Sequence, residues 1–291
     1  MKIPPLEIQE LIATHMRTPL SIIDFMAVGG GSINHSFRVV IDKKKVIFCK
    51  INSVLEFPLL FKKEQQGLEM LGAQKILRIP KVIAVFESGK YQVLLLEWIE
   101  EGLKSSGFWL RFGEQLASLH RISSPTFGFE DDNYMGALPQ YNRPNKNWID
   151  FFIEQRLVPQ VKLARENKLL GIEEISLFEK LYSRLPQLFT SDPPALLHGD
   201  LWSGNFLCDL TGNPVLIDPA VYFGNRQVDL AMTRLFGGFE SPFYQAYHYH
   251  YPLPSNHREQ WEVCNLYPLL IHLNLFGKQY LQGILSTLKQ F

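Results

Sequence analysis

One short polar segment in the last third of the chain constrains the fold more than any other feature. Residues 198–205 read His-Gly-Asp-Leu-Trp-Ser-Gly-Asn, and two short strand-like runs follow around the turn signal Thr-Gly-Asn-Pro at 211–214. In a hairpin over about 206–217 that is centred on this turn, Asn205 and Asp218 are equidistant from the turn. The pattern therefore predicts that these two side chains lie side by side at the open end of a hairpin.

The residue types in this segment point to phosphoryl transfer. An Asp followed five residues later by an Asn is the spacing of a kinase catalytic loop, in which the Asp accepts the substrate hydroxyl proton and the Asn holds a magnesium ion. Here these are Asp200 and Asn205. With Asp218 beside them, they would form a hard-oxygen site for Mg²⁺ and bound phosphates. Each aspartate alone could equally be a turn or capping residue. We interpret His198 as a structural histidine bonded to nearby backbone.

The first hundred residues carry the signals of a β-sheet lobe that could hold a nucleotide. Strand-like runs at 25–28 and 36–41 flank a glycine run, Gly29–Gly31, which Ser32 follows. Backbone N–H groups of such a loop could approach phosphate oxygens closely. Glycine-rich hairpin turns are common, however, and no Gly-Lys-Ser/Thr of a P-loop follows.

A buried ion pair is predicted between Lys50 and the helix that follows it. Lys50 lies within the strand-like run 46–52, and on one face of that strand a partly buried lysine needs an anionic partner. Glu64 lies in the apolar stripe of the predicted helix 58–73, where a carboxylate needs a cation. We therefore predict the pair Lys50–Glu64. The alternative is that Glu64 edges the stripe and pairs with a surface lysine.

The pattern over the whole chain is that of an α+β protein. A β-rich front, with a hairpin over 82–97, gives way near 97–102 to helical segments at about 105–121, 147–168 and 172–186. We predict a two-lobed, protein-kinase-like fold. Its N-terminal lobe, 1–98, would bind the nucleotide and would consist of an antiparallel sheet with one main helix. Its larger, mainly helical C-terminal lobe, 99–291, would carry the catalytic and substrate sites.

The charge balance and the cysteines limit the partners that we expect. Lys+Arg and Asp+Glu each number 29, so the chain has no overall field for nucleic acid. Its apolar runs are too short to span a membrane. Three scattered cysteines do not form a disulfide framework and suggest a reducing compartment. We expect a cytoplasmic protein without nucleic-acid or membrane partners, as a monomer or weak homodimer.

Sequence blocks spread over nearly the whole chain carry a family resemblance. They include GGGSINHSFRV (29–39), FKKEQQGLEML (61–71), WIDFFIEQRL (148–157), LLHGDLWSGNFL (196–207) and LIDPAVYFGNRQVDLAM (216–232). With these blocks the chain resembles the fructosamine kinases, or ketoamine 3-kinases, within the aminoglycoside-phosphotransferase-like kinases. Trp202 and the blocks NYMGALPQ (133–140) and LFGGF (235–239) distinguish this family from choline and aminoglycoside kinases.

The resemblance implies a kinase that uses ATP and Mg²⁺. Its acceptor would be the 3-hydroxyl of a ketoamine, a sugar attached to a protein lysine or a free amine. Phosphorylation at this position makes the adduct unstable, so that the amine is restored and glycation is repaired. Family members outside animals usually favour ribulosamines and erythrulosamines, so we place these ahead of fructosamine.

The resemblance also implies roles for individual residues. Asp200 would be the base, Asn205 and Asp218 the magnesium ligands, and Lys50 with Glu64 the pair that holds the phosphates. A further set would surround the nucleotide: Gly29, Gly30, Gly31, Ser32 and Asn34 as the loop over the phosphates, and Glu97, Trp98 and Ile99 as the hinge whose backbone holds adenine.

Three further points follow from the resemblance. Trp202 would stack on the sugar or wall the acceptor pocket. Asp229 would brace the catalytic loop or act as an acid at a helix N-terminus. Many family members have a cysteine in the glycine loop that is linked to redox-sensitive dimers. This chain has Ser32 there, which puts such switching in doubt.

Other functions stay open at this stage. A non-catalytic nucleotide-binding protein would have lost one of Asp200, Asn205 and Asp218, and all three are present. A metal-dependent hydrolase could use the histidines of 247–250 together with His257. We interpret 247–250 instead as an aromatic, proline-flanked loop of exposed histidines or as an aromatic cluster at the lip of the substrate site. A kinase of aminoglycosides or choline-type alcohols would need an acidic acceptor site. The acidic run 130–132 is interpreted instead as a solvated loop.

Overall fold

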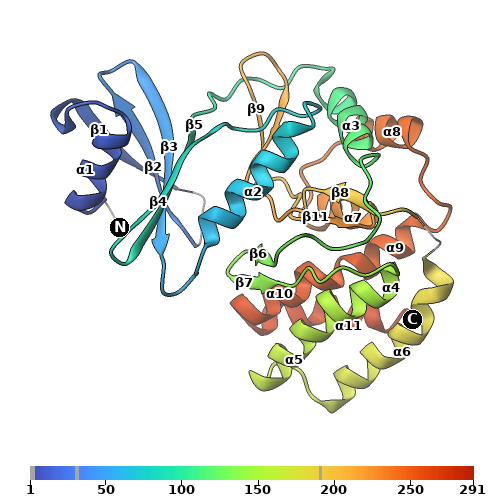
Figure 1. The fold of residues 1–291 in the computed structure, drawn as a ribbon. Helices are drawn as coiled ribbons and strands as arrows, with labels where there is room; N and C mark the ends of the chain where they lie inside the picture. Colours follow the sequence, from blue (N-terminus) through green and yellow to red (C-terminus); the bar gives the residue numbers. More distant parts are fainter. Residues whose placement is uncertain (1–3, 30–32, 190–191) are drawn as a thin grey trace. The chain divides into compact units, whose positions relative to one another are not determined.

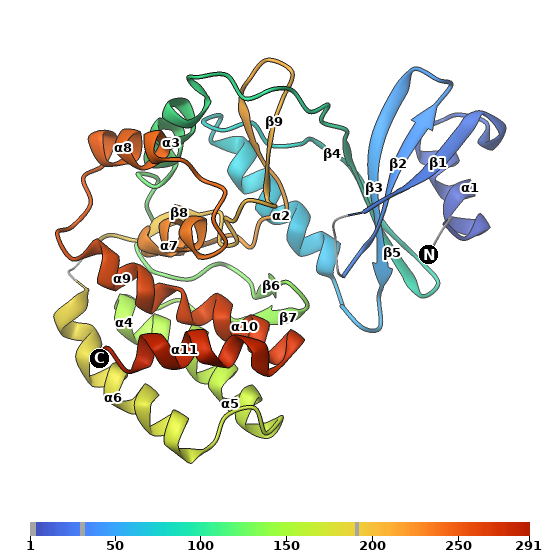
Figure 2. The same ribbon diagram turned by 180° about the vertical axis from the view of Figure 1, so that it is seen from behind.

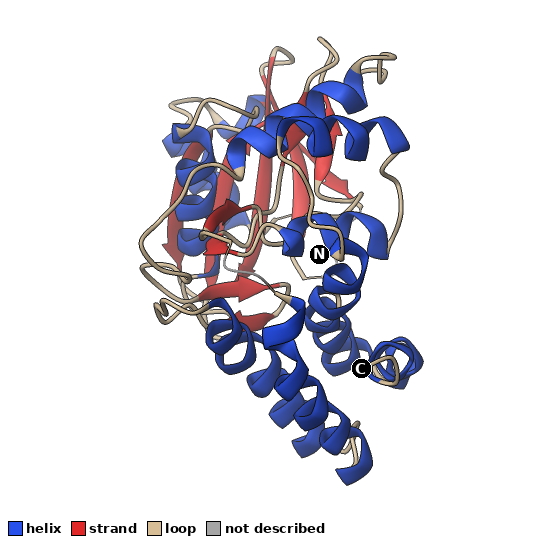
Figure 3. Ribbon diagram, turned by 90° about the vertical axis from the view of Figure 1, so that its right-hand side faces the viewer, coloured by secondary structure: helices blue, strands red, loops and turns tan. Residues whose placement is uncertain are grey.

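The chain forms two compact units of mixed α and β structure. The computed structural model describes residues 4–29, 33–189 and 192–291. The first unit comprises Met1–Leu103 with Leu207–Asp218, and the second comprises Lys104–Phe206 with Pro219–Phe291. Both kinds of secondary structure are visible in Figure 3, in agreement with the predicted α+β class. The assignment of lobes 1–98 and 99–291 as domains stays a prediction.

The first unit is built on a five-stranded antiparallel sheet. Its strands are β1 (Ile23–Val28), β2 (His35–Ile41), β3 (Lys45–Ser53), β4 (Val82–Ser88) and β5 (Tyr91–Glu97). Their order across the sheet is β1-β2-β3-β5-β4. Lys50 pairs with Ser36 on one side and Leu94 on the other, so it lies on the central strand. The sequence had indicated each of these strands.

Two helices cover opposite faces of this sheet, as Figures 1 and 2 show. Helix α1 (Leu6–His15) packs Ile8 and Ile12 into an apolar core with Cys49 and other strand residues. Helix α2 (Leu60–Ala73) lies on the other face, which is that of Lys50. Successive residues of a strand point to opposite faces, so Cys49 enters the core while Lys50 meets α2. The sequence analysis had not indicated α1.

A hairpin from a distant part of the sequence belongs largely to the first unit. It consists of β9 (Phe206–Cys208) and β10 (Pro214–Leu216), as predicted. The Gly102 N–H donates to the Cys208 carbonyl at 2.8 Å, and the Leu216 N–H donates to the Arg78 carbonyl at 3.0 Å. The Arg78 guanidinium also bonds Asp209 at 2.6 Å in the hairpin turn. These bonds join the segment that ends at Asp218 to the first unit.

The second unit is mainly helical. Its helices are α3 (Phe108–Leu119), α4 (Trp148–Phe151), α5 (Val158–Glu166), α6 (Ile172–Leu188), α7 (Gln227–Leu235), α8 (Ser241–His250), α9 (His257–Cys264), α10 (Leu266–Phe276) and α11 (Leu281–Leu288). It also has two small sheets, β6 (Asn133–Met135) with β7 (Leu138–Gln140), and β8 (Ala195–Leu197) with β11 (Tyr222–Gly224). Short 3₁₀ turns occur at Leu20–Ile22 in the first unit and at Lys278–Tyr280 in the second.

Two features of the second unit differ from the sequence analysis. The segment expected to be helical at about 147–168 contains a π-helical turn, Phe152–Leu157, between α4 and α5. The interpretation of 247–250 as a loop was wrong, because these residues complete α8. This helix packs closely on α3, where a Cβ added at Gly113 would overlap the Phe243 carbonyl oxygen. Within the described part of the chain, no helix combines the length and apolar character that a bilayer crossing requires.

Candidate active site

In the first unit, the side chain of Lys50 contacts two carboxylates. Its Nζ lies 2.7 Å from Glu64 Oε1 and 2.8 Å from Asp218 Oδ1. The Lys50 side chain is 3% exposed and that of Glu64 is 10% exposed, whereas the Asp218 side chain is 43% exposed. The predicted pair Lys50–Glu64 is thus confirmed, and Glu64 is not a surface residue paired with a surface lysine. The contact with Asp218 had not been predicted.

The surroundings of Lys50 keep it charged. Burial alone would lower the pKa of Lys50, but the adjacent carboxylates of Asp218 and Glu64 outweigh burial and hold that pKa above its ordinary value. Burial raises the pKa of Glu64, and Lys50 opposes this shift. The result is a fixed ammonium group between a buried carboxyl and a half-exposed one. Such a group suits an anionic ligand.

Asp218 holds its place through an unusual backbone conformation. It follows the end of β10 and has φ of 54°, in the left-handed region that few residues other than glycine adopt. This conformation turns the chain sharply after the strand, and the carboxylate reaches Lys50. Its other oxygen is left for a further partner. Backbone conformations of this kind concentrate at functional sites because the surroundings must maintain them.

The predicted nucleotide loop is only partly described. Gly30, Gly31 and Ser32 lie outside the described residues. Around an added Cβ at Gly29 there is open space. Asn34 Oδ1 accepts a hydrogen bond of 2.7 Å from the Asn52 amide, two residues beyond Lys50 on β3. The end of the loop is therefore anchored to the strand that carries Lys50.

The predicted hinge residues have defined side-chain contacts in the first unit. Glu97 accepts hydrogen bonds from Arg78 at 2.9 Å and from the Lys81 backbone at 3.2 Å. The Trp98 indole donates to Glu100 at 2.9 Å, and Ile99 is buried. These contacts fix the side chains, and any role in binding adenine would belong to the backbone.

Asp200 and Asn205, the predicted catalytic-loop residues, lie together in the second unit. The Asn205 amide nitrogen donates at 2.8 Å both to Asp200 Oδ2 and to the Asp200 carbonyl. Asn205 is buried, with 6% of its surface exposed. Since its nitrogen is the donor in both bonds, its amide oxygen is the atom left for a cation. The predicted approach of Asn205 to Asp218, which belongs to the first unit, stays a prediction.

Asp229 holds the backbone of this loop through hydrogen bonds. Its Oδ2 accepts the His198 N–H at 2.8 Å, and its Oδ1 accepts the Gly199 N–H at 2.9 Å. Asp229 also lies in the first turn of α7, so it is both an acid at a helix N-terminus and a support of the loop. Its carboxylate oxygens accept hydrogen bonds from the loop backbone. The His198 ring accepts from the Asp200 N–H at 3.3 Å, which agrees with a structural role for His198.

Two buried residues that the sequence analysis missed support Asp229. His120 Nε2 lies 3.2 Å from Asp229 Oδ2, and His120 Nδ1 lies 2.8 Å from the Tyr247 hydroxyl. Burial alone would raise the pKa of Asp229, but hydrogen bonds and charge from its neighbours hold that pKa below its usual range. Burial lowers the pKa of His120. An ionised Asp229 cannot donate, so a neutral His120 donates through Nε2 and accepts from Tyr247.

Trp202 forms part of an aromatic wall beside the loop. Its ring covers Gly204, where an added Cβ would overlap the indole. The ring centroids of Trp202 and Phe236 are 6.0 Å apart, with the rings nearly perpendicular. This geometry is compatible both with stacking on a sugar and with walling a pocket.

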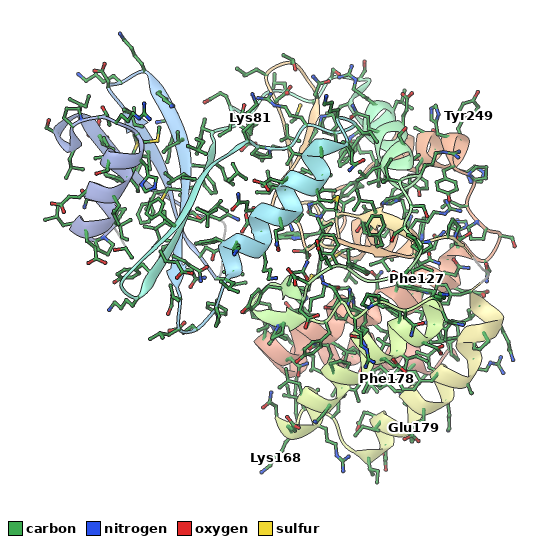
Figure 4. The ribbon with its side chains drawn as sticks, in the orientation of Figure 1. Lys81, Phe127, Lys168, Phe178, Glu179 and Tyr249 are labelled. Atoms are coloured by element: carbon green, nitrogen blue, oxygen red, sulfur yellow. The ribbon has the colours of Figure 1, made fainter. Side chains whose placement is uncertain are left out.

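The structure does not support the metal-hydrolase alternative. His248 and His250 lie on α8, and Tyr249 projects outward from that helix with 82% of its surface exposed (Figure 4). Among residues 4–29, 33–189 and 192–291, no three His, Cys, Asp or Glu side chains are grouped to hold a metal ion. A magnesium ion held by one carboxylate, one amide oxygen and phosphates does not need such a group.

Comparison with known proteins decides the family. The family model described as "Fructosamine kinase" matches residues 6–291. The chain belongs to the fructosamine kinase family. It is thus a member of a kinase family, whose members are phosphotransferases. The resemblance carried by the sequence blocks is confirmed.

Curated relatives in this family cover most of the chain. A probable ketoamine kinase of Synechocystis is 40% identical over 273 residues, which is 94% of this chain and 91% of that protein. The chloroplastic protein-ribulosamine 3-kinase of Arabidopsis thaliana is 34% identical over 91% of this chain and 81% of its own. The ketosamine-3-kinase of Mus musculus is 32% identical over 90% of this chain and 92% of its own.

Solved structures agree on the fold. A crystal structure from Haemophilus somnus with a provisional assignment as a fructosamine-3-kinase has a TM-score of 0.86, with 25% identity over 97% of this chain and 96% of that chain. Amicoumacin kinase has a TM-score of 0.61, with 12% identity over 99% of this chain and 93% of its own. The likeness at 12% identity shows a shared fold alone, and it confirms the predicted kinase-like fold.

Proposed function

We propose that this fructosamine kinase family member transfers the γ-phosphoryl group of ATP to the 3-hydroxyl of a ketoamine, with ribulosamine or erythrulosamine preferred over fructosamine. The observation that carries the proposal is the buried Lys50, paired at once with Glu64 and Asp218. Such a lysine is the group that cradles ATP phosphates in kinases. The acceptor class is supported by relatives named ketoamine kinase, protein-ribulosamine 3-kinase and ketosamine-3-kinase.

In this proposal each charged side chain has one task. Asp200 accepts the proton of the attacking hydroxyl, and Lys50, oriented by Glu64, holds the α- and β-phosphates. The residues fit a magnesium ion, since the half-exposed Asp218 carboxylate and the Asn205 amide oxygen are both hard oxygen donors. When bound, Mg²⁺ neutralises charge on the phosphates.

The remaining nucleotide contacts would come from the N-terminal lobe, 1–98, and the residue that follows it. The glycine loop, Gly29–Ser32 with Asn34, would cover the phosphates through its backbone N–H groups. The backbone of Glu97, Trp98 and Ile99 would hold adenine. In the C-terminal lobe, 99–291, Trp202 would stack on the sugar of the acceptor. We also propose that the protein acts in the cytoplasm, without nucleic acid or membrane, as a monomer or weak homodimer.

The proposal is tested with a panel of acceptors. Purified protein, ATP and Mg²⁺ are incubated with ribulosamine- and fructosamine-bearing lysine derivatives, choline and an aminoglycoside. ADP and the released free amine are then measured. The ketoamines should be phosphorylated, with ribulosamine giving the higher kcat/KM. Turnover of choline or the aminoglycoside, with none of any ketoamine, would refute the acceptor assignment.

A matched variant tests the base. Asp200→Asn keeps an oxygen that can accept the bond from the Asn205 amide, so the loop retains that contact while the proton acceptor is lost. We expect turnover to fall by about a hundredfold or more while calorimetric ATP binding stays within about threefold. Normal turnover in this variant would remove Asp200 as the base.

A further inference from the structure

The block NYMGALPQ (133–140) forms a small hairpin whose ends are polar and buried. It consists of β6 and β7, with Asn133 pairing with Gln140. Asn133 is 8% exposed, and Gln140 and the nearby Asn142 are 0% exposed. Figures 1 and 2 show the hairpin beside α10. A buried amide must satisfy its hydrogen bonds, so the partners of these three side chains indicate what the hairpin does.

The amides of this hairpin hold the backbone just after Asp218. Gln140 Nε2 donates to Asn133 Oδ1 at 2.8 Å and to the Ala220 carbonyl at 3.0 Å. Asn133 Nδ2 donates to the Val221 carbonyl at 2.8 Å. Two consecutive carbonyls, 80 and 88 residues further along the chain, are therefore fixed by one strand pair.

The segment that these amides hold supports the catalytic loop in turn. The Ala220 N–H donates to the His198 carbonyl at 2.9 Å. The Ala220 carbonyl lies so close to Gly199 that a Cβ at Gly199, which has φ of 85°, would overlap its oxygen. His198 and Gly199 are the two residues that precede Asp200 in the chain. A shift of Ala220 would therefore displace the backbone from which Asp200 projects.

A buried arginine completes the network. Arg156, from the π-helical turn, is 0% exposed and donates to Asn142 Oδ1 at 2.7 Å and to the Tyr141 carbonyl. Its guanidinium carbon lies 4.0 Å from the centre of the Tyr222 ring. In the described part of the chain, Arg156 forms no ion pair with a carboxylate. Burying a cation among neutral groups costs desolvation free energy. The protein therefore keeps Arg156 at this position although it lowers the stability of the fold.

Tyr267, in α10, supports Gln140. Its hydroxyl donates to Gln140 Oε1 at 3.1 Å. Burial raises the pKa of Tyr267, the Arg156 charge lowers it, and the Asp200 charge raises it.

We propose that Gln140 and Asn133, supported by Asn142 and Arg156, are positioning residues for phosphoryl transfer. They fix Ala220 and Val221, and through Ala220 they set the backbone of His198 and Gly199, and so the direction of Asp200. None of the four needs to touch the substrate. The inference rests on the proposed function only in that Asp200 must act as the base for the kinetic effect to appear.

Gln140→Leu tests the proposal against a matched control, Gln260→Leu. Gln260 is 1% exposed in the same unit, and its amide nitrogen also makes two hydrogen bonds, to the Leu188 carbonyl and to Asn256. Both variants lose a buried amide, so both should melt at a lower temperature. Gln140→Leu alone should lower kcat by about tenfold or more, with KM for ATP within about twofold of wild type. Gln260→Leu should keep kcat within about twofold of wild type.

A conservative variant tests rescue. In Gln140→Glu, burial would hold the new carboxyl protonated, so it can still donate one hydrogen bond to the Ala220 carbonyl. This variant should recover part of the lost kcat at low pH and lose it as the pH rises and the carboxyl ionises. It also serves if Gln140→Leu does not fold. A kcat in Gln140→Glu that stays far below that of wild type even at low pH, where the carboxyl can still donate to the Ala220 carbonyl, would overturn the proposal.

Hydrogen exchange gives a readout that does not depend on the acceptor. Peptides that cover 196–205 and 219–223 should exchange faster in Gln140→Leu than in wild type, and at the wild-type rate in Gln260→Leu. Unchanged exchange in Gln140→Leu, or equal loss of kcat in both variants, would overturn the positioning role. If no ketoamine is turned over but the exchange pattern holds, the positioning role stands and only the acceptor assignment fails.

Discussion

Replacing Lys50 with methionine perturbs the candidate site in a way whose size can be worked out from its burial. The substitution leaves Glu64, 10% exposed, without its cation. Removal of one partner from a buried ion pair costs about 3–5 kcal/mol of unfolding free energy. At roughly 2–4 °C per kcal/mol for a chain of about this size, the melting temperature should fall by about 6–20 °C. Asp218, with 43% of its side chain exposed, turns to water and adds little.

The loss should depend on pH, because Glu64 can escape its charge by taking up a proton. Burial already raises the pKa of Glu64, and without Lys50 nothing opposes that shift. A group whose folded pKa lies above its unfolded value contributes stability at low pH and loses it as the pH rises through the folded pKa. The deficit of Lys50→Met relative to wild type should therefore be larger at pH 8 than at pH 5. The pKa of Lys50 is itself raised, so its own titration falls above this window.

The assay is chemical denaturation of four proteins at the two pH values. These are wild type, Lys50→Met, Lys50→Met/Glu64→Gln, and Lys62→Met as a control on the exposed side of α2. The double variant removes the buried charge, so it should recover more than about half of the deficit at pH 8 and show little pH dependence. The control should change the unfolding free energy by less than about 0.5 kcal/mol. Equal deficits at both pH values, together with no relief in the double variant, would refute the reasoning.

Three further outcomes follow from other contacts. Asp229→Asn removes a charged acceptor from two backbone N–H groups, so unfolding free energy should fall by about 3 kcal/mol and kcat by about a hundredfold, as measured by denaturation and steady-state kinetics. Trp202→Ala should raise KM for the ketoamine by about tenfold and leave KM for ATP unchanged; a change in the ATP constant alone would contradict the proposed stacking. The three cysteines are buried, and burial raises the pKa of the thiols of Cys49 and Cys264. A thiol reagent should therefore label none of Cys49, Cys208 and Cys264 in the folded protein, and a reductant should not alter activity.

The parts of the site that depend on local periodicity could be predicted from the sequence. Alternation along β3 and the apolar stripe of α2 were enough to pair Lys50 with Glu64, 14 residues apart. The spacing within 198–205 predicted that Asp200 and Asn205 belong together, and the turn signal predicted the hairpin β9–β10. Each of these inferences uses the geometry of a single strand, helix or turn.

The missing parts depend on contacts that no local pattern encodes. Lys50 meets Asp218 over a separation of 168 residues, and His120 meets Asp229 over 109. Residues 247–250, the end of α8, were interpreted as a loop because their aromatic and histidine side chains, followed by Pro252, lack a clear apolar stripe. The role of NYMGALPQ was not readable, since amides in three-residue strands give no periodic signal. Only the partners of these amides reveal what they hold.

The hairpin β9–β10 also has a consequence for how the protein is made. The first unit is discontinuous, since the chain leaves it at Leu103 and returns at Leu207. During synthesis from the N-terminus, Lys50 and Glu64 are made long before Asp218. Arg78 likewise has no Asp209 to bind until the chain has returned to the first unit at Leu207. A ribosome-bound fragment that ends near residue 103 therefore lacks the hairpin groups that bond the backbone of Arg78 and Gly102. Protease resistance of nascent chains should rise only after residue 218 has emerged.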